Sequence, residues 1–347
     1  MSLLDYVLGA KAGSVSVVGT AKNVGKTVTL NQLINEATER GIGIGVTSTG
    51  REGEKTDTLT SEEKPPIYVP AGALLATAEA ALRESEVYAE ILEVMPYTTL
   101  MGDVVLGRVR EGGEVLVVGP ETTTELRETV AAMHRHGAQL VLVDGSIDRV
   151  AAAAPTVTDV TVLCTGAAAA LDLEGVLEKT RLVVELFRLG PPGDVKLWQV
   201  ARRIVGERAV AVVSRGYEVQ NLKMKTALES TGAIAAAVKG DSLAVVFGGA
   251  LTDGLLEAMA DLPPEVKVEV VAADPTRILV GPDAWYRFKR SGRRLSVVNP
   301  VRLVAVSANP VGLGGAAFDP GDFLEKVAKV VRPLPVVDVV LGREARG

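Results

Sequence analysis

The sequence predicts an α/β protein built on a doubly wound, mostly parallel β-sheet, with a second α/β half. Short and almost continuously apolar runs alternate with segments of helical periodicity from one end of the chain to the other. Strands this apolar are typical of parallel sheets that helices cover on both faces. Hydrophobic residues make up 47% of the 347 positions and mean hydropathy is positive, so a substantial core is expected and extended disorder is not.

The first part of the chain is expected to alternate strands and helices. An apolar strand at 14–19 leads through a glycine turn into a helix at 25–41, which Gly41 ends. Segment 73–85 is predicted to be a helix, and the closely spaced apolar runs after it favour antiparallel pairing or a hairpin. Threonines supply capping signals at the start of a helix at 122–137. The other expected elements are strands at 43–49, 65–69, 89–94, 103–109, 114–119, 139–145 and 159–166 and a helix at 172–190.

The alternation resumes in the second part of the chain. The best linker candidate is LGPPGD at 189–194, because proline and glycine interrupt regular structure. We therefore divide the chain into a first domain at 1–189, a linker at 190–206 and a second region at 207–347. The second region is either a separate α/β domain or an extension of the first sheet. Its expected elements are strands at 208–214, 243–249, 266–272, 295–300, 302–310 and 335–342 and a helix at 319–331.

Composition excludes several classes of function. The net charge of −6 and the pI of about 5.3 disfavour a surface that binds the phosphates of nucleic acids. Cys164 is the single cysteine; it is expected in a strand core and fits a reducing compartment. His134 and His136 point apart on a helix, so we expect a solvated helix end and no zinc site. No signal peptide is recognisable, and Pro155 and Asp159 interrupt the most apolar stretch, so we expect a cytoplasmic protein without a membrane span.

Residues 20–27, TAKNVGKT, match the phosphate-loop pattern G-x-x-x-x-G-K-[ST] except at its first position. Gly25 lets the backbone approach phosphate oxygens, and the amides of 22–27 can point inward at a helix N-terminus, where the dipole favours an anion. Lys26 is expected to reach the β- and γ-phosphates, and Thr27 to ligate Mg²⁺. The motif predicts that 1–189 is a P-loop domain for ATP or GTP with Mg²⁺. The expected contacts are Thr20, Lys22, Asn23, Val24, Gly25, Lys26, Thr27 and Val28.

Alternatives remain open within this motif. A strand-to-helix turn can contain Gly-Lys-Thr without binding phosphate, and Lys22 is either a plain loop lysine or a second phosphate contact. Asp144 follows four apolar strand residues, which is the pattern of a Walker B carboxylate near Mg²⁺. An aspartate that caps a turn at the strand end is the alternative. Gly145 is expected to offer its amide to the γ-phosphate.

Charged side chains gather at 51–57, after the second strand and at the same edge of the sheet. Glu54 or Glu52 is expected to hold Mg²⁺ through water or to position the attacking water, and Arg51 to stabilise the transferred phosphate charge. Asp57 belongs to the same cluster, and a solvated charged loop is an equally common explanation. The catalytic candidates are therefore Lys26, Asp144 and Glu54, and the metal candidates are Thr27, Asp144 and Glu54.

Two features in the second part of the chain are weaker candidates. Asn309 ends an apolar strand and is able to read a purine edge, although an Asn-Pro turn is the better interpretation. The turn GGALTD at 248–253 is either a second anion-binding turn or a simple helix cap at Thr252 or Asp253.

The loop GTAKNVGKT resembles that of dethiobiotin synthetases, G-T-x-T-x-V-G-K-T. The resemblance covers about the first 190 residues and implies a doubly wound P-loop architecture. Those synthetases carry a catalytic lysine after the second strand, whereas this chain has VTSTGREGE there and no lysine until Lys55. The departure disfavours the carboxylation chemistry of that family.

A longer pattern, which includes GVTSTGREGE, LVDGSIDRVAAAAPTVTDVTVLCTGA and VRLVAVSANP, resembles the ATP-binding reactivase subunit of adenosylcobalamin-dependent lysine 5,6-aminomutase. It implies a chaperone-like role with two protein partners, a second ATPase subunit and the cobalamin-dependent mutase, and is compatible with a homo-oligomer. The rival hypotheses are an ATP-dependent ligase of the dethiobiotin synthetase type, acting on a small molecule, and a nucleotide binder without turnover. A lysine-lined pocket beside the nucleotide would favour the ligase.

Overall fold

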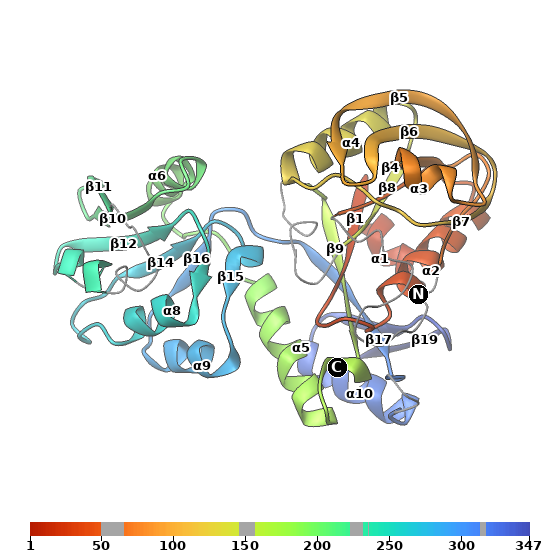
Figure 1. Ribbon diagram of the computed structural model, residues 1–347. Coiled ribbons are helices and arrows are strands. Elements are labelled where there is room, and N and C mark those ends of the chain that lie inside the picture. The colour runs from red at the N-terminus through yellow and green to blue at the C-terminus, as the bar shows by residue number, and fades with distance from the viewer. Residues whose placement is uncertain (50–65, 146–156, 223–231, 235, 313–316) are drawn as a thin grey trace. The chain divides into compact units, whose positions relative to one another are not determined.

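The computed structural model describes residues 1–49, 66–145, 157–222, 232–234, 236–312 and 317–347. These residues form two compact units. Unit 1 contains Met1–Arg181 together with Arg302–Gly347, and unit 2 contains Leu182–Val301. Figure 1 shows the two ends of the chain in unit 1.

Unit 1 is built on a ten-stranded sheet with the order β19-β18-β17-β9-β1-β8-β2-β4-β6-β5. The strands from β18 to β4 run parallel, and antiparallel strands complete both edges. The α/β class and the large, mostly parallel sheet predicted from the sequence are therefore confirmed. The parallel strands are β1 (Ser14–Gly19), β2 (Ile44–Ser48), β4 (Leu74–Ala78), β8 (Leu140–Asp144), β9 (Val160–Gly166), β17 (Leu303–Asn309) and β18 (Pro335–Asp338).

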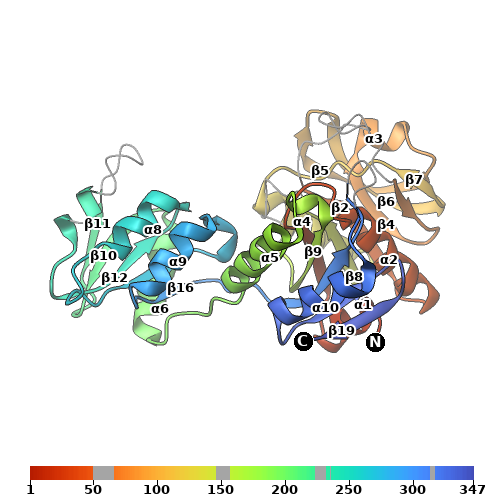
Figure 2. The same ribbon diagram turned by 90° about the horizontal axis from the view of Figure 1, so that it is seen from below.

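The remaining elements of unit 1 lie at the edges and on the faces of this sheet (Figures 1 and 2). β5 and β6 form the antiparallel hairpin that the sequence predicts, and β3 pairs with β7 in a separate two-stranded sheet. These elements are α1 (Leu3–Gly9), α2 (Lys26–Glu39), β3 (Ile67–Val69), α3 (Glu79–Arg83), β5 (Tyr88–Thr99), β6 (Gly102–Glu111), β7 (Gly113–Val115), α4 (Thr123–Arg135), the 3₁₀ turn Ala167–Ala169, residues 173–181 of α5 (Leu173–Phe187), α10 (Pro320–Val331) and β19 (Arg343–Arg346).

Strand register shows which face of the sheet α2 covers. Gly19 pairs with Cys164, and Val17 pairs with Asp144, so these four side-chain positions share one face. The Cys164 thiol donates to Thr29 Oγ1 of α2 over 3.4 Å. Helix α2 therefore packs on the face to which Asp144 also points.

Helices α4 and α5 cover the opposite face. Gly45 lies three positions before the Asp144 partner Ser48 and so points away from α2; a Cβ there would lie 2.8 Å from Met133 Sδ of α4. On β9, Thr165 follows Cys164 and bonds Thr180 of α5. The sheet is therefore covered on both faces, as the apolar strands predict.

Segment 73–85 corrects one prediction. Its first part is strand β4, which lies between β2 and β6, and only Glu79–Arg83 is helical. All residues of Leu74–Ala78 are buried. The helix-forming alanine and leucine residues are held in the strand because a central sheet position buries both of their faces, and this tertiary effect exceeds the small difference in helix propensity.

The predicted domain division also differs from the structure. Residues 302–347 return to unit 1, where β17, β18 and β19 extend the large sheet, whereas 182–301 form a sheet of their own. The predicted linker at 190–206 contains helix α6 (Val195–Gly206), which Asp194 caps by accepting bonds from the amides of Lys196 and Leu197. Both alternatives for 207–347 thus apply, each to a different part of that region.

Unit 2 is a five-stranded α/β sheet with the order β11-β10-β12-β14-β16. Strands β12, β14 and β16 are parallel, and β10 and β11 are antiparallel to their neighbours. A short pair, β13 and β15, lies beside it. The bounds are β10 (Val210–Ser214), β11 (Val219–Leu222), β12 (Ser242–Phe247), β13 (Leu251–Thr252), α8 (Asp253–Ala260), β14 (Glu269–Ala272), the 3₁₀ turn Pro275–Arg277, β15 (Ile278–Leu279), α9 (Pro282–Arg290) and β16 (Leu295–Val297).

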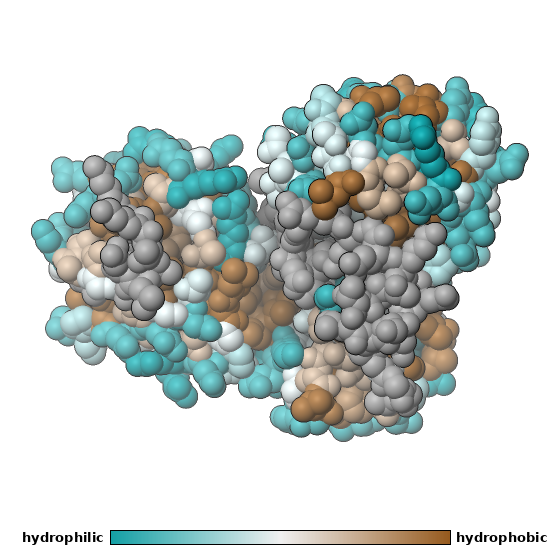
Figure 3. Space-filling view, in the orientation of Figure 1, coloured by the Kyte–Doolittle hydropathy of each residue, from teal (hydrophilic) through white to brown (hydrophobic). Residues whose placement is uncertain are grey.

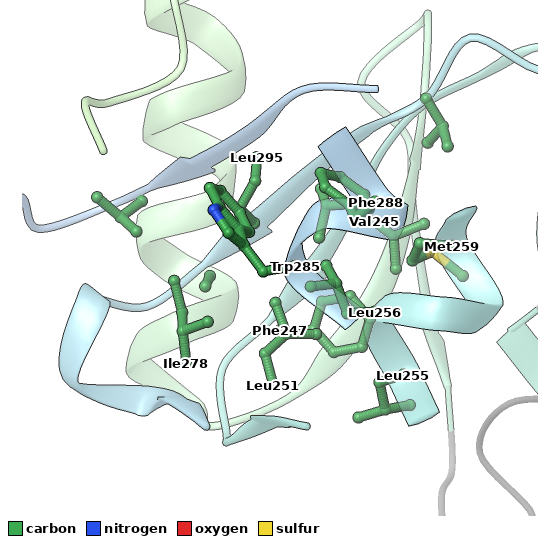
Figure 4. Close-up of a cluster of buried hydrophobic side chains, with 14 of the residues drawn as sticks. Val245, Phe247, Leu251, Leu255, Leu256, Met259, Ile278, Trp285, Phe288 and Leu295 are labelled. Carbon is green, nitrogen blue, oxygen red and sulfur yellow. The ribbon is translucent and has the colours of Figure 1, made fainter. Parts of the chain in front are cut away.

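The sheet of unit 2 has a buried cluster on each face. Alternate residues of β12 separate them: Val245 and Phe247 join one cluster, and Ala244 and Val246 join the other. The first cluster holds the apolar faces of α8 and α9, with Phe247 and Phe288 fully buried (Figure 4). The second lies under α6. Unit 2 therefore has a core of its own.

Hydrophilic side chains cover much of the visible surface of each unit (Figure 3). An apolar patch lies over β5, the edge strand on which Tyr88, Ile91 and Val94 are exposed. Within the described ranges, no helix is both long and apolar enough to cross a membrane.

Candidate functional site

The predicted phosphate loop connects the end of β1 to the start of α2. The Thr20 amide donates to the Cys164 carbonyl oxygen over 2.9 Å, so the loop leaves the sheet beside β9. Val24 is 1% exposed and anchors the loop in the core. Gly25 has φ = 90° and is the N-cap of α2, with no side-chain hydrogen bond to that cap. The turn uses the left-handed backbone that glycine adopts without steric cost, and it leaves the first amides of α2 without intrahelical acceptors.

Lys26 and Thr27 are the first residues of α2. A Cβ at Gly19 would lie 2.8 Å from Val24 Cγ2 and 3.2 Å from Lys26 Cδ. The absence of a side chain at Gly19 therefore lets the stem of Lys26 lie back over the loop toward the end of β1. In phosphate loops a lysine in this position points its ammonium group at the phosphates that the loop encloses.

A buried group of polar side chains fixes the first turn of α2. Thr29 Oγ1 donates to the Gly25 carbonyl oxygen over 2.9 Å, and Ser307 Oγ of β17 lies 2.7 Å from Thr29 Oγ1. Because the single Thr29 hydroxyl hydrogen goes to Gly25, both Ser307 and Cys164 donate to Thr29. The group ties the N-cap of α2 to the neighbouring strands β9 and β17.

Asp144 lies at the end of β8, beside the end of β1. Its register partner Val17 places its side chain on the α2 face, where Lys26 and Thr27 begin the helix. The Asp144 carbonyl oxygen accepts the Thr49 amide over 3.0 Å, which holds the segment after β2 against β8. The predicted loop residues and the predicted carboxylate thus share one edge and one face of the sheet.

The prediction for Gly145 is wrong in one respect. Its amide donates to the Val17 carbonyl oxygen over 2.9 Å. This bond is part of the parallel ladder at the last register pair of β1 and β8, Val17 and Asp144, so the amide belongs to the sheet and is not directed at the loop.

The charges of Lys26 and Asp144 both affect the pKa of the buried Cys164 thiol. Burial raises the pKa of the Cys164 thiol to about 12, the Lys26 ammonium opposes this rise, and the Asp144 carboxylate adds to it. Both charges therefore lie within electrostatic reach of one buried atom below the loop. The thiol itself remains protonated and has no nucleophilic character at neutral pH. Cys164 is a core strand residue, as the sequence predicts.

Thr20 occupies the position of the first glycine in the motif. Its hydroxyl donates to Thr165 Oγ1 over 3.3 Å, so the side chain is turned toward β9. Thr165 in turn bonds Thr180 of α5 over 2.6 Å. A threonine is accommodated here because β9 supplies a polar partner for its side chain.

Asn309 packs against the loop from the end of β17. A Cβ at Gly25 would lie 3.1 Å from Asn309 Cβ and 3.3 Å from its Nδ2. Asn309 Oδ1 accepts the Val311 amide over 3.1 Å, so the predicted turn is confirmed. Reading of a purine edge by Asn309 stays a prediction.

The other residues predicted to contact the nucleotide differ in exposure and in backbone conformation. Lys22 is exposed, Asn23 has φ = 57°, and Val28 is 38% exposed. Arg51, Glu52, Glu54 and Asp57 lie outside the described residues.

The weaker candidates have structural partners. Thr252 is the N-cap of α8 but makes no capping side-chain bond, and Asp253 Oδ1 accepts the Gly281 amide over 2.7 Å. His134 and His136 lie at the end of α4, where His134 Nδ1 is 2.9 Å from the Ala138 carbonyl oxygen and His136 Nε2 is 3.1 Å from Glu93. In the described part of the chain, no three His, Cys, Asp or Glu side chains form a group that could hold a metal.

Sequence reasoning missed the hydroxyl groups beneath the loop, Thr29, Thr165, Thr180 and Ser307. The sequence signal of Thr165 and Ser307 is a polar residue within an apolar run, VTVLCTG and LVAVSAN, and that of Thr29 is its place one turn after Gly25.

No known protein-family model, curated protein or solved structure matches this chain.

Proposed function

We propose that this chain is a P-loop NTPase that binds ATP or GTP with Mg²⁺ between the 20–27 loop and Asp144. The observation that carries the proposal is the convergence of Gly25, Lys26 and Thr27 with Asp144 on one face, at the carboxyl edge of adjacent parallel strands. Each is the residue type that nucleotide binding requires at that place.

Sheet topology also supports a nucleotide site at the carboxyl edge of the sheet, beside β1. The central order is β2-β8-β1-β9-β17. From β1 the chain continues through α2 to β2, on the β8 side of β1, whereas β9, the strand that follows β8 in sequence, lies on the other side of β1. The chain thus changes direction beside β1, and ligands of open α/β sheets bind outside the carboxyl ends of the strands at such a point.

Each residue has a defined role in this proposal. The left-handed Gly25 and the uncapped first turn of α2 present amides to the β-phosphate. Lys26 neutralises charge on the β- and γ-phosphates, and buried Val24 keeps the loop in place. Preformed donors of this kind stabilise the developing charge without reorganisation, which is the main source of catalysis in phosphoryl transfer.

The donor set fits Mg²⁺. This ion keeps several waters and takes few protein ligands, so a hydroxyl at Thr27 and a carboxylate at Asp144 suffice beside the phosphates, and a cluster of carboxylates is not required. When bound, Mg²⁺ neutralises charge on the β- and γ-phosphate oxygens.

We further propose that nucleotide turnover serves a chaperone-like reactivase role toward a cobalamin-dependent aminomutase, with a second ATPase subunit. The support is the sequence resemblance, and we assign partner binding to unit 2, which has buried cores of its own.

Nucleotide binding is tested by thermal melts with ATP and Mg²⁺. Saturation at about 100-fold over the dissociation constant should stabilise the wild type by about 2.7 kcal/mol. Lys26→Ala should lose most of this shift, because it removes charge-assisted contacts worth roughly 1.5–3 kcal/mol each. Lys329→Ala, at an exposed lysine in the last turn of α10, is the matched control and should keep the shift. A wild type that shows no shift with either ATP or GTP would refute the assignment.

The reactivase role is tested with inactivated mutase. This chain, its partner subunit, ATP, Mg²⁺ and fresh cofactor should restore activity, and Lys26→Ala should not. Absence of recovery with a wild-type chain that binds nucleotide would reject the reactivase role and leave the nucleotide site standing.

A further inference from the structure

A chain of hydroxyl groups leads from the loop into α5. Thr20 Oγ1 lies 3.3 Å from Thr165 Oγ1, which lies 2.6 Å from Thr180 Oγ1. Thr180 Oγ1 donates to the Val176 carbonyl oxygen over 2.7 Å. Thr165 and Thr180 are fully buried, so no solvent competes for the bond between them, and the Thr20 end of the chain is partly buried. In such a chain each bond polarises the next.

The direction of this chain is fixed by counting hydrogens. A hydroxyl group carries one hydrogen, and Thr180 uses its own for the Val176 carbonyl. Thr165 must therefore donate to Thr180, and Thr20 must donate to Thr165. While the chain is intact, the Thr20 hydroxyl has no hydrogen for a phosphate oxygen. A phosphate in the loop favours donors, so it favours the arrangement in which Thr20 leaves Thr165.

Helix α5 belongs to both units. Residues 173–181 lie in unit 1 and 182–187 in unit 2, within one continuous helix (Figure 1). Its first half is held beside the end of β9 by Thr180 and by Lys179, whose Nζ donates to the Ala169 carbonyl oxygen over 2.6 Å. Rigid secondary elements are among the structures that carry coupling between distant sites, and α5 is one continuous helix.

The second half of α5 is held by α9 of unit 2. Glu185 Oε2 accepts Trp285 Nε1 over 2.6 Å and pairs with Lys289 Nζ at 2.7 Å. Thr180 and Glu185 are five positions apart, a rise of about 7.5 Å along the helix. Both tryptophans of the chain, Trp198 and Trp285, lie in unit 2, and Trp285 is 5% exposed.

We propose that Thr165 and Thr180 are positioning residues that couple occupancy of the phosphate loop to α5, and that α5 carries the change to Trp285 and Lys289 in unit 2. The inference rests on the proposed nucleotide binding. The coupling arises because bound phosphate and the intact hydroxyl chain compete for the Thr20 hydrogen, which gives the ligand different affinities for the two arrangements.

The test uses the full-length Trp198→Phe chain, in which Trp285 is the remaining tryptophan. A non-hydrolysable ATP analogue with Mg²⁺ is titrated while Trp285 fluorescence is recorded, and binding is measured separately by calorimetry. We expect a fluorescence change that saturates with binding. Thr180→Val, which removes the hydroxyl at nearly constant volume, should bind the analogue and lose the change. Thr180→Ser, which keeps the hydroxyl, should restore it.

Each outcome decides the proposal. An unchanged Trp285 signal despite calorimetric binding overturns the coupling and leaves the nucleotide site intact. A Thr180→Val chain whose Trp285 fluorescence change keeps its full amplitude also overturns the coupling and leaves the nucleotide site intact. Absence of binding to the Trp198→Phe chain and to the wild type overturns the proposed function and the coupling with it. If Thr180→Val loses the fluorescence change and Thr180→Ser does not restore it, Thr180 acts through packing alone, and this result also overturns the proposal.

Discussion

Asn309, at the end of β17, closes the space above the Cα atom of Gly25, at the start of α2. A Cβ at position 25 would lie 3.1 Å from Asn309 Cβ and 3.3 Å from its Nδ2. Gly25 also has φ = 90°, where a residue with a side chain is strained. Two independent features therefore require glycine at position 25: its left-handed backbone, and the close approach of Asn309, which lies 284 positions later in the chain.

Gly25→Ala is predicted to abolish the nucleotide-induced melting shift. The left-handed backbone costs about 1–2 kcal/mol for a residue with a Cβ, and displacement of Asn309 adds to that cost. Gly41→Ala is the matched control, since φ there is 66° and a Cβ meets nothing within 4 Å. It should lower the melting temperature and keep the nucleotide shift. Equal nucleotide shifts for wild type and Gly25→Ala would contradict the close approach of this backbone to phosphate.

Asp144→Asn is predicted to weaken nucleotide binding only when Mg²⁺ is present. The amide keeps the shape of the side chain and removes the charge that fits the ion. Affinity measured by calorimetry should fall at least tenfold with Mg²⁺ and change little in EDTA. Asp159→Asn is the control: Asp159 lies just before β9 and accepts bonds from the Gly13 and Ser14 amides. An equal loss for Asp144→Asn with and without Mg²⁺ would contradict the metal role.

The sequence predicted the loop because its requirements are local. Gly25, Lys26 and Thr27 follow one another, and the apolar run before them and the periodic run after them define a strand and a helix. Asp144 was also predictable, because an acid that directly follows a buried parallel strand must lie at the carboxyl edge of the sheet.

The remaining features depend on contacts between distant residues. A strand at 302–310 is predicted from the sequence, but its place beside β9 is set by pairing between Leu303–Asn309 and residues about 140 positions earlier, which no local pattern encodes. Leu74–Ala78 forms a strand because the sheet buries it, against its helical composition. The hydroxyl groups of Thr165 and Thr180 were missed for the same reason, since their meaning depends on which helix covers β9.

Cys164 is predicted to resist thiol reagents in the folded protein at pH 8 and to react fully in denaturant, because it is fully buried.

Burial raises the pKa of the Cys164 thiol to about 12 from an ordinary value of 9.0. Between these values the unfolded chain loses the thiol proton and the folded chain keeps it, so the free energy of unfolding falls as pH rises through this window. Below pH 9 the contribution is fully present. Cys164→Ala should show a smaller decline in denaturant titrations between pH 8 and 11, and parallel declines would contradict the raised pKa.

Two fully buried phenylalanines test the independence of the units, Phe247 of β12 in unit 2 and Phe323 of α10 in unit 1. Either change to alanine should cost about 3–5 kcal/mol in the unit that contains it, from lost burial and the cavity left behind. Hydrogen exchange with mass spectrometry should show faster exchange in β12 and β14 for Phe247→Ala, with β1 and β17 unchanged, and the reverse for Phe323→Ala. Because the proposed nucleotide site lies wholly in unit 1, Phe247→Ala should still show the ATP-dependent protection of α2. Faster exchange throughout both units in either variant would show that they share one cooperative core and would contradict the division at residues 181 and 302.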